Sequence, residues 1–218
     1  MHKIFLMHRI SEPAILYFGT PVVLIGTVNE NGTYNLAPIS SAFWLGWRCI
    51  IGISSSSKTT ENLIRTKECV LNLPSVDEVK AVDRLALTTG SNPVPETKKR
   101  RGYEFEQEKF ERANFTSLRA DIVDAPRAME CPVQMESTVI AINPLFSDDP
   151  SQQGRIVTIE LKILRAHIED SILMEDQPNR VDPDKWKPLI MSFQQFYGLT
   201  DRVYPSTLAT VPERLYAK

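Results

Sequence analysis

The sequence predicts a mainly β protein, in which antiparallel strands form a closed or partly closed barrel with helices at its ends. Two observations support this fold class. At least six segments have the apolar or alternating pattern of short strands, against two or three with helical spacing. Strands and helices also do not alternate in the order that a parallel α/β sheet requires. The 218 residues are enough for one core, and we expect a single domain over residues 1–218.

The first strands are predicted as a hairpin. Residues 22–28 are rich in β-branched side chains and lead into a turn sequence, Asn-Glu-Asn-Gly, at 29–32. Residues 33–39 are expected to return as the partner strand. A further short apolar strand is predicted at 48–53, after a connection at 40–47 that is rich in aromatic and small residues.

A helix is expected at residues 59–67, after four consecutive serines at 54–57 and a lysine. Glu61 lies in its first turn, where a negative charge complements the helix dipole. Residues 69–73 return to an apolar strand pattern. Apolar residues at helical spacing then predict a second helix at 76–87.

Residues 76–121, the excursion, interrupt this succession of strands. Its part at 91–117 is polar, and we expect this part to run over the surface as a lid or a dimer arm. Strands follow at 133–142 and 157–163, the second of which alternates between apolar and polar residues. The C-terminal tail, 200–218, has no regular pattern and is expected to be irregular.

Composition and charge argue against several functions. A net charge of −2 gives no basic surface of the kind that binds nucleic acid or an anionic membrane. No apolar run approaches the roughly 20 residues of a membrane helix, and the N-terminus lacks the pattern of a secretory signal, so we expect a cytoplasmic protein. Neither a disulfide framework nor a metal site is expected, because the cysteines and histidines are scattered: Cys49, Cys69, Cys131, His2, His8 and His167.

One candidate binding site lies where the serine run enters the first predicted helix. Backbone N–H groups at a helix start lack intrahelical partners and point outward, which suits an anion such as a phosphate. Hydroxyl groups add donors, and a lysine adds a compact positive charge. The same pattern also describes a polar loop with Thr59 as the helix cap, and local chemistry leaves both interpretations open. The residues concerned are Ser54, Ser55, Ser56, Ser57, Lys58, Thr59 and Asn62.

A second candidate lies at the end of the predicted hairpin. A proline and small side chains let a flat heteroaromatic ring approach the backbone, although a strand exit or a β-bulge has the same composition. These residues are Asn35, Ala37, Pro38, Ser40 and Ser41.

Two further features each have two interpretations. The aromatic residues Phe43, Trp44 and Trp47 either stack on a ligand or pack in a core or an interface. The basic run at 98–101 is followed by glutamates and is typical of a solvated face, although it could grip the phosphate of a nicotinamide dinucleotide. No nucleophile–base pair, P-loop or G-x-G-x-x-G motif is present, so an enzyme with this sequence needs a cofactor to supply its chemistry.

Four segments in this order resemble the flavin-reductase-like family of FMN-binding split barrels. Two of them match short elements of the family, N-x-A-P-x-S and S-K-T-x-E-N. The third, with Ala-Pro-Arg and then Glu-Cys-Pro-Val-Gln-Met-Glu, and the closing segment are similar to further elements. The positions are 35–40, 57–62, 125–127 with 130–136, and 188–189 with 197–198.

The resemblance implies a six-stranded antiparallel split barrel that forms a homodimer, with FMN bound near the subunit interface. It also implies that NADH or NADPH reduces the flavin, often for a partner monooxygenase. Carried over by residue, it implies a ring and ribityl site formed by Asn35, Ala37, Pro38, Ser40 and Ser41, a phosphate site formed by Ser54, Ser55, Ser56, Ser57, Lys58, Thr59 and Asn62, and Cys131 close to the ring.

Three functions fit these observations. The first is an oxidoreductase that passes hydride from a nicotinamide to FMN, and the second is an FMN-binding electron carrier reduced by a protein partner. The third is a dimeric barrel without flavin, in which the aromatic loop is only an interface. The excursion is long for a simple flavin reductase. This departure from the family pattern concerns the activity and the substrate more than the FMN site.

Overall fold

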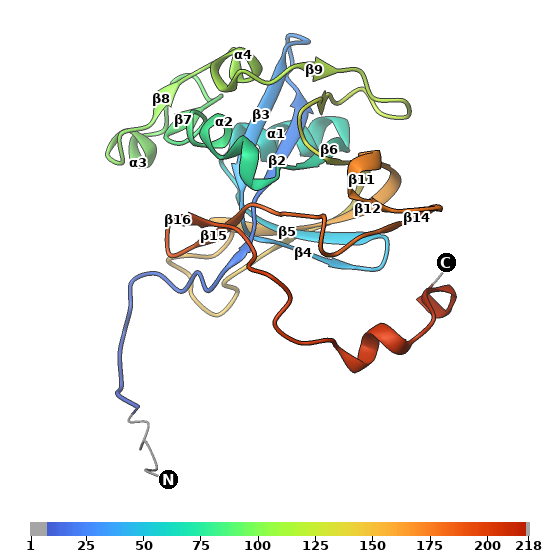
Figure 1. Ribbon diagram of the computed structural model, residues 1–218. Helices are drawn as coiled ribbons and strands as arrows, with labels where there is room; N and C mark the ends of the chain where they lie inside the picture. Colours follow the sequence, from blue (N-terminus) through green and yellow to red (C-terminus); the bar gives the residue numbers. More distant parts are fainter. Residues whose placement is uncertain (1–7, 217–218) are drawn as a thin grey trace.

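The computed structural model describes residues 8–216, so predictions on residues 1–7 and on the last two residues of the tail lie outside it. Its main element is an antiparallel sheet of seven strands in the order β3-β2-β6-β11-β12-β5-β4 (Figure 1). The strand bounds are β2 Val23–Val28, β3 Tyr34–Ile39, β4 Ala42–Leu45, β5 Arg48–Ser54, β6 Glu68–Leu73, β11 Val133–Pro144 and β12 Ile156–Ile168.

The sheet curls until its two edges meet. β3 and β4 are opposite edges in the strand order, yet only Ser40 and Ser41 separate them along the chain. Seven strands in a flat sheet would place the outer two roughly 29 Å apart, whereas a two-residue link spans only about 10 Å. The link therefore requires curvature, and the Gly52 amide extends the β4–β5 pairing into the link with a hydrogen bond of 2.8 Å to the Ser41 carbonyl. The mainly β split-barrel prediction is confirmed.

The count of six strands is one short, because β4 lies within the segment 40–47 that the sequence suggests to be a connection. Ala42 is buried and Trp44 packs against the core, while Phe43 and Leu45 are exposed. This is the alternation of a strand with one buried face. The pattern is hidden in the sequence, since all four side chains are apolar.

The barrel core is built from inward-facing side chains of the long strands. Ile25, Ile51, Leu71, Ile159 and Leu161 are each fully buried in one hydrophobic cluster. They alternate along their strands with residues on the other face of the sheet, as the period of two residues requires. This rigid sheet holds the end of β3 and the start of α1 (Lys58–Thr66) in fixed positions.

The excursion forms a layer above β2 and β3 (Figure 1). Its Val82, Leu85 and Phe110 pack with Leu24 and Leu36 of those strands in a second hydrophobic cluster. The cluster anchors the excursion on the sheet. Its elements are η1 Val76–Glu78, α2 Val79–Asp83, β7 Thr88–Thr89, α3 Glu96–Lys99, β8 Glu104–Phe105, α4 Lys109–Ala113 and β9 Ser117–Leu118.

The helix predicted at 76–87 is shorter and divided. Ser75 caps a 3₁₀ turn in a capping box with Glu78, and α2 then ends at Asp83. Leu87 has a φ of 54°, a left-handed conformation that no helix continues through. The chain turns there because β7 pairs with β8 instead.

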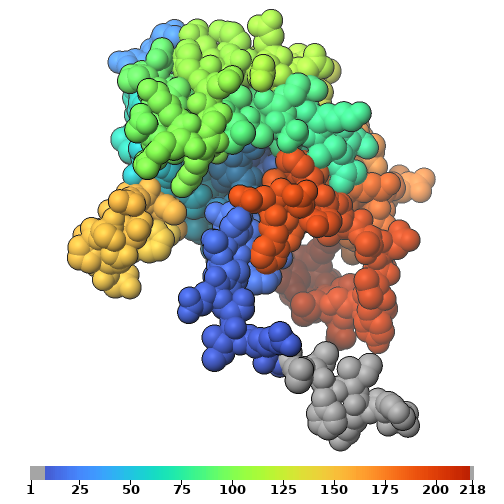
Figure 2. Space-filling model, turned by 90° about the vertical axis from the view of Figure 1, so that its left-hand side faces the viewer, coloured from blue at the N-terminus to red at the C-terminus, as the bar shows by residue number. Residues whose placement is uncertain are grey.

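Smaller sheets and the terminal segments complete the structure. Within residues 8–216, no helix is long and apolar enough to cross a membrane. The segments near both ends run away from the body of the molecule (Figure 2) and expose apolar side chains, among them Phe18 and Tyr204. The remaining elements are β1 Thr20–Pro21, β10 Arg127–Ala128, η2 Asp170–Ile172, β13 Leu173–Met174, β14 Gln177–Val181, β15 Ile190–Ser192, β16 Gln195–Tyr197, η3 Thr207–Thr210 and η4 Glu213–Tyr216.

Candidate functional site

A cavity of about 170 Å³ lies between the end of β3, the start of α1 and the excursion. Both segments that the sequence indicates as a binding site contribute to its wall. Within the described residues, no carboxylate lines the cavity. The lining residues are Asn35, Ala37, Pro38, Ile39, Ile53, Ser57, Lys58, Thr59, Leu85, Ala86, Leu87, Thr88, Thr89, Gly90, Lys98, Tyr103 and Lys109.

The start of α1 borders this cavity. Ser57 is the helix cap, because its Oγ accepts a hydrogen bond of 3.1 Å from the Thr60 amide, so the cap precedes the Thr59 that the sequence suggests. The Thr60 hydroxyl donates to the Ser54 carbonyl at 2.7 Å, which fixes the loop. The first amides of a helix have no acceptor within the helix, and Lys58 and Thr59 carry two of them. This end of α1 therefore offers N–H donors and a positive dipole to an anion.

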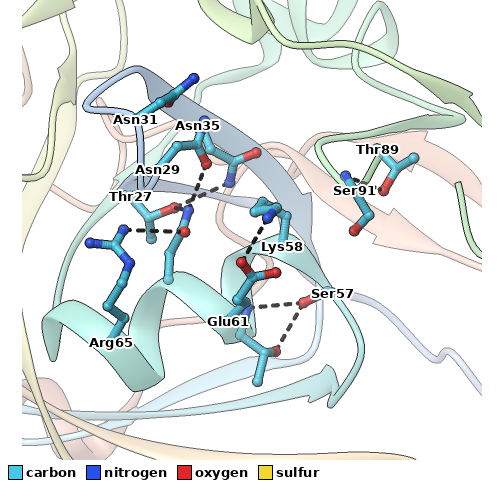
Figure 3. A network of polar contacts seen from close by, with 12 residues as sticks. Thr27, Asn29, Asn31, Asn35, Ser57, Lys58, Glu61, Arg65, Thr89 and Ser91 are labelled. Carbon is cyan, nitrogen blue, oxygen red and sulfur yellow. Dashed lines mark hydrogen bonds and ion pairs between the residues drawn. The ribbon is translucent and has the colours of Figure 1, made fainter. Parts of the chain in front are cut away.

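Asn35, which lies beside Thr27 in Figure 3, connects the two segments. Its Nδ2 donates to Thr27 Oγ1 and to Thr59 Oγ1, each at 3.2 Å. The Asn62 amide lies behind it, donating to Thr27 Oγ1 at 3.0 Å and to Asn29 Oδ1 at 2.9 Å. Asn35 faces the cavity, whereas Asn62 is fully buried and ties α1 to the first hairpin.

The serines before Ser57 have local partners. Ser54 Oγ and Ser56 Oγ lie 3.2 Å apart, and Ser55 Oγ donates to the Arg155 carbonyl at 3.3 Å. None of the three is in the cavity lining. They shape the turn that presents Ser57 and the start of α1.

Three other predicted residues lie away from the lining. Ser40 and Ser41 form the link that closes the barrel. Cys131 is buried in the cluster between the excursion and the sheet, and burial raises the pKa of its thiol. The structure thus groups Asn35, Ala37, Pro38, Ser57, Lys58 and Thr59 at the cavity and places the other predicted residues around it.

Two lysines of the excursion add positive charge to the cavity. Lys98 Nζ donates to Thr89 Oγ1 at 3.0 Å and lies 5.6 Å from the centre of the Tyr103 ring. Lys109 Nζ donates to Thr88 Oγ1, and the side chain is only 2% exposed. Burial lowers the pKa of both lysines, and for Lys109, where Lys98 adds to the effect, to about 8.

Sequence reasoning missed Lys109, and it connected Lys98 only with a nicotinamide phosphate, as one alternative for the basic run. The run at 98–101 has the pattern of a solvated face, which describes Lys99, exposed beside Glu96, but not its neighbour Lys98. Lys109 stands alone in a polar segment with no signal of burial. Only the packing of the excursion on β3 brings both ammonium groups to the cavity.

The segment at 130–136, part of the family resemblance, has a clear anchoring role. The Glu136 carboxylate is fully buried and accepts hydrogen bonds from the amides of Asp121, Ile122 and Val123 at 2.6 to 3.1 Å. It also lies 2.6 Å from His167 Nε2. Burial would raise the pKa of Glu136, but the bonds from His167 and the three amides outweigh it and lower the pKa to about 2. Glu136 therefore holds the end of the excursion on the sheet.

The aromatic residues of the segment 40–47 do not line the cavity. Trp44 packs against the barrel core, and its buried indole Nε1 has no hydrogen-bond partner among the described residues. Phe43 and Trp47 are partly exposed on the β4 side of the sheet. For Trp44, the structure therefore supports packing in the core rather than stacking on a ligand.

Solved structures share this fold. Flavoredoxin of Desulfovibrio vulgaris (Miyazaki F) is similar with a TM-score of 0.73 at 18% identity, over 94% of this chain and 99% of that chain. Nitrilotriacetate monooxygenase component B from Bacillus cereus is similar with a TM-score of 0.69 at 18% identity, over 88% of this chain and 89% of that chain. At these identities the likeness shows the fold.

Sequence comparison shows the family. The chain is 37% identical over 188 residues to the uncharacterized protein YdfE of Bacillus subtilis (strain 168), which covers 86% of this chain and 87% of that protein. Residues 15–200 match the model of the flavin reductase like domain. The chain therefore belongs to the flavin reductase-like domain family.

Proposed function

We propose that this protein binds FMN at the cavity between β3, α1 and the excursion, and passes hydride to it from NADH or NADPH. Family membership supports a flavin cofactor and an oxidoreductase activity. The FMN assignment rests on one observation: a helix start and three lysines surround a cavity in whose described lining there is no carboxylate. These are the donors that a phosphate requires.

The size of the cavity indicates which part of FMN it holds. Sites that enclose a whole drug-sized ligand usually measure about 300–1,000 Å³, and this one measures about 170 Å³. It therefore fits the phosphate and the adjoining part of the ribityl chain. Ser57, Lys58 and Thr59 would hold the phosphate, and Asn35, Ala37 and Pro38 would border the chain that leads to the ring.

Bound FMN supplies the redox chemistry by accepting a hydride from the nicotinamide. The residues of this chain hold the phosphate, fix the orientation of the ligand and exclude water from its polar end. No acid–base pair is needed for this task.

A second copy of the chain is proposed to complete the ring site, in a homodimer. The exposed apolar side chains near both ends, such as Phe18 and Tyr204, provide surface for it. The likeness to a monooxygenase component supports a partner monooxygenase as acceptor of the reduced flavin. We place the protein in the cytoplasm, where its three free cysteines stay reduced.

The first test is anaerobic addition of NADH and, separately, NADPH to the flavin-loaded protein. Loss of the oxidised flavin band with either donor is the expected result. If neither donor bleaches the band, the reductase activity is wrong. The protein would then be an FMN-binding electron carrier that a protein partner reduces. The excursion favours this function, because it covers the phosphate end and presents a surface to a protein partner.

A further inference from the structure

The three lysines at the cavity differ in their partners. Lys58 of α1 forms an ion pair with Glu61, at 2.7 Å from Nζ to Oε1. Lys98 and Lys109, both from the excursion, donate to the threonine hydroxyls of β7. Among the described residues, neither has an ion pair with a carboxylate. The excursion thus brings two cations to the cavity without an ion-paired carboxylate, and Glu106 of the excursion acts on Lys109 only as a nearby charge.

Lys109 shows the consequence most clearly. Its side chain is 2% exposed, and burial of an ammonium group without an ion-pair partner is costly. The Thr88 hydroxyl accepts a hydrogen bond but carries no charge. Lys98 lies near enough to act on it as a like charge, which adds to the cost. An apolar side chain would fill the same space without this cost, so the two ammonium groups indicate a cavity built for an anion.

We propose that the excursion makes this cavity selective for a phosphate monoester, so that the protein binds FMN in preference to FAD and to riboflavin. The inference rests on the proposed flavin binding at the same cavity. It gives the excursion a role in ligand choice, through Lys98 and Lys109.

The selectivity follows from charge and geometry. A phosphate monoester carries about −1.5 to −2 charges on one group and presents three free oxygens. Each phosphate of FAD carries one ester bond, one anhydride bond and a single negative charge, and riboflavin has no phosphate. Three ammonium groups around about 170 Å³ therefore favour the ligand that concentrates its charge on one group.

The 2′-phosphate of NADPH is also a monoester, so it has the same chemistry. We assign the cavity to the flavin phosphate, because its wall includes the start of α1 and the Asn35, Ala37 and Pro38 segment of β3. Kinetic comparison of NADPH with NADH distinguishes the flavin phosphate from the nicotinamide 2′-phosphate.

The test measures dissociation constants for FMN, FAD and riboflavin by flavin fluorescence, in the wild type and in Lys98→Met and Lys109→Met. Lys99→Met is the matched control, since Lys99 is an exposed neighbour outside the cavity lining. Loss of a charge-assisted bond should weaken FMN binding about 10- to 100-fold in the two variants. Riboflavin binding should change less than about twofold, because it has no phosphate for the lysines to contact.

Three results would overturn the inference. One is FAD binding to the wild type as tightly as FMN. Another is a parallel loss of FMN and riboflavin affinity in the lysine variants, which would make the lysines merely structural. A rise in KM for NADPH but not for NADH, with FMN affinity unchanged, would assign the lysines to the nicotinamide and likewise overturn it.

Inorganic phosphate provides a measurement that needs no flavin. It should raise the thermal unfolding temperature of the wild type and of Lys99→Met, but not of Lys98→Met or Lys109→Met, because a ligand that binds only the native state stabilises it. If phosphate stabilises the wild type while all three flavins fail to bind, the proposed function fails and the anion site stands. If phosphate stabilises all variants equally, the anion site fails. Should Lys109→Met not fold, Lys98→Met carries both measurements.

Discussion

Asn35 Nδ2 donates a hydrogen bond to Thr59 Oγ1 across 3.2 Å, and this bond joins the two sequence segments that form the candidate site. Asn35 is on β3 and Thr59 is in the first turn of α1, so the bond fixes the helix start relative to the strand. Both side chains are almost completely buried and border the cavity. The position of the proposed phosphate site therefore depends on a polar contact inside the fold.

Replacing Asn35 by alanine should weaken the fold and the site together. The change leaves the buried hydroxyls of Thr27 and Thr59 without this donor, and it should lower the free energy of unfolding by about 1–3 kcal/mol. Urea denaturation and FMN titration measure the two effects. The exposed Asn179→Ala is the control and should leave both unchanged. Full FMN affinity in Asn35→Ala would contradict the role of the bond in the site.

FMN affinity should decrease as pH rises through about 8. Burial and the nearby Lys98 lower the pKa of Lys109 to about 8, while Glu106 acts in the opposite direction. The ammonium form attracts the phosphate, so the contribution of Lys109 is complete well below pH 8 and is lost above it. A fluorescence titration from pH 6.5 to 9.5, chosen to stay above the phosphate pKa of about 6, should show a decrease of about tenfold.

Lys109→Met should remove most of this pH dependence. The variant has no titrating group at this position, so only the weaker effect of Lys98 remains. An unchanged slope in the variant would show that another group causes the dependence.

Glu136→Gln should lower stability in a pH-dependent way. The pKa of Glu136 is lowered from 4.5 to about 2 in the folded protein, so its carboxylate stabilises the fold above about pH 4.5 and this contribution is lost as pH falls toward 2. The difference corresponds to about 3 kcal/mol at neutral pH. Urea denaturation at several pH values should show wild type and variant converging in acid. The exposed Glu30→Gln should follow the wild type throughout.

Gly26→Ala should destabilise the contact between β2 and the segment that follows the excursion. A Cβ at Gly26 would lie 2.3 Å from the Pro126 carbonyl oxygen, which is backbone and cannot rotate away. Overpacking of this kind costs about 1–3 kcal/mol. Hydrogen exchange at residues 120–128 should become faster in the variant. Unchanged exchange and unchanged stability would show that the segment shifts freely.

The barrel and the helix start could be predicted from sequence because their signals are local. β12 alternates between apolar and polar residues, and Ser57 to Asn62 combine a cap with a cation at a strand–helix junction. β4 escaped prediction, since Phe43 and Leu45 are apolar although exposed, and alternation then disappears from the sequence.

The excursion's part in the site could not be predicted, because it arises from packing between distant segments. Lys98 and Lys99 are adjacent and chemically identical, yet only Lys98 turns to the cavity. For Cys131, by contrast, the sequence indicates a site residue that the structure places away from the cavity. Its segment resembles the family, but its thiol is buried in the cluster beneath the excursion, and the neighbouring Glu136 acts as an anchor.

The central claim is that the cavity at Asn35, Lys58 and Lys109 holds the phosphate of FMN. The visible spectrum of the purified protein, together with the mass of the ligand released on denaturation, tests it most directly. We predict flavin absorption and a released ligand with the mass of FMN. A colourless preparation whose thermal stability does not increase when FMN is added would contradict the account, because a ligand of the native state must stabilise it.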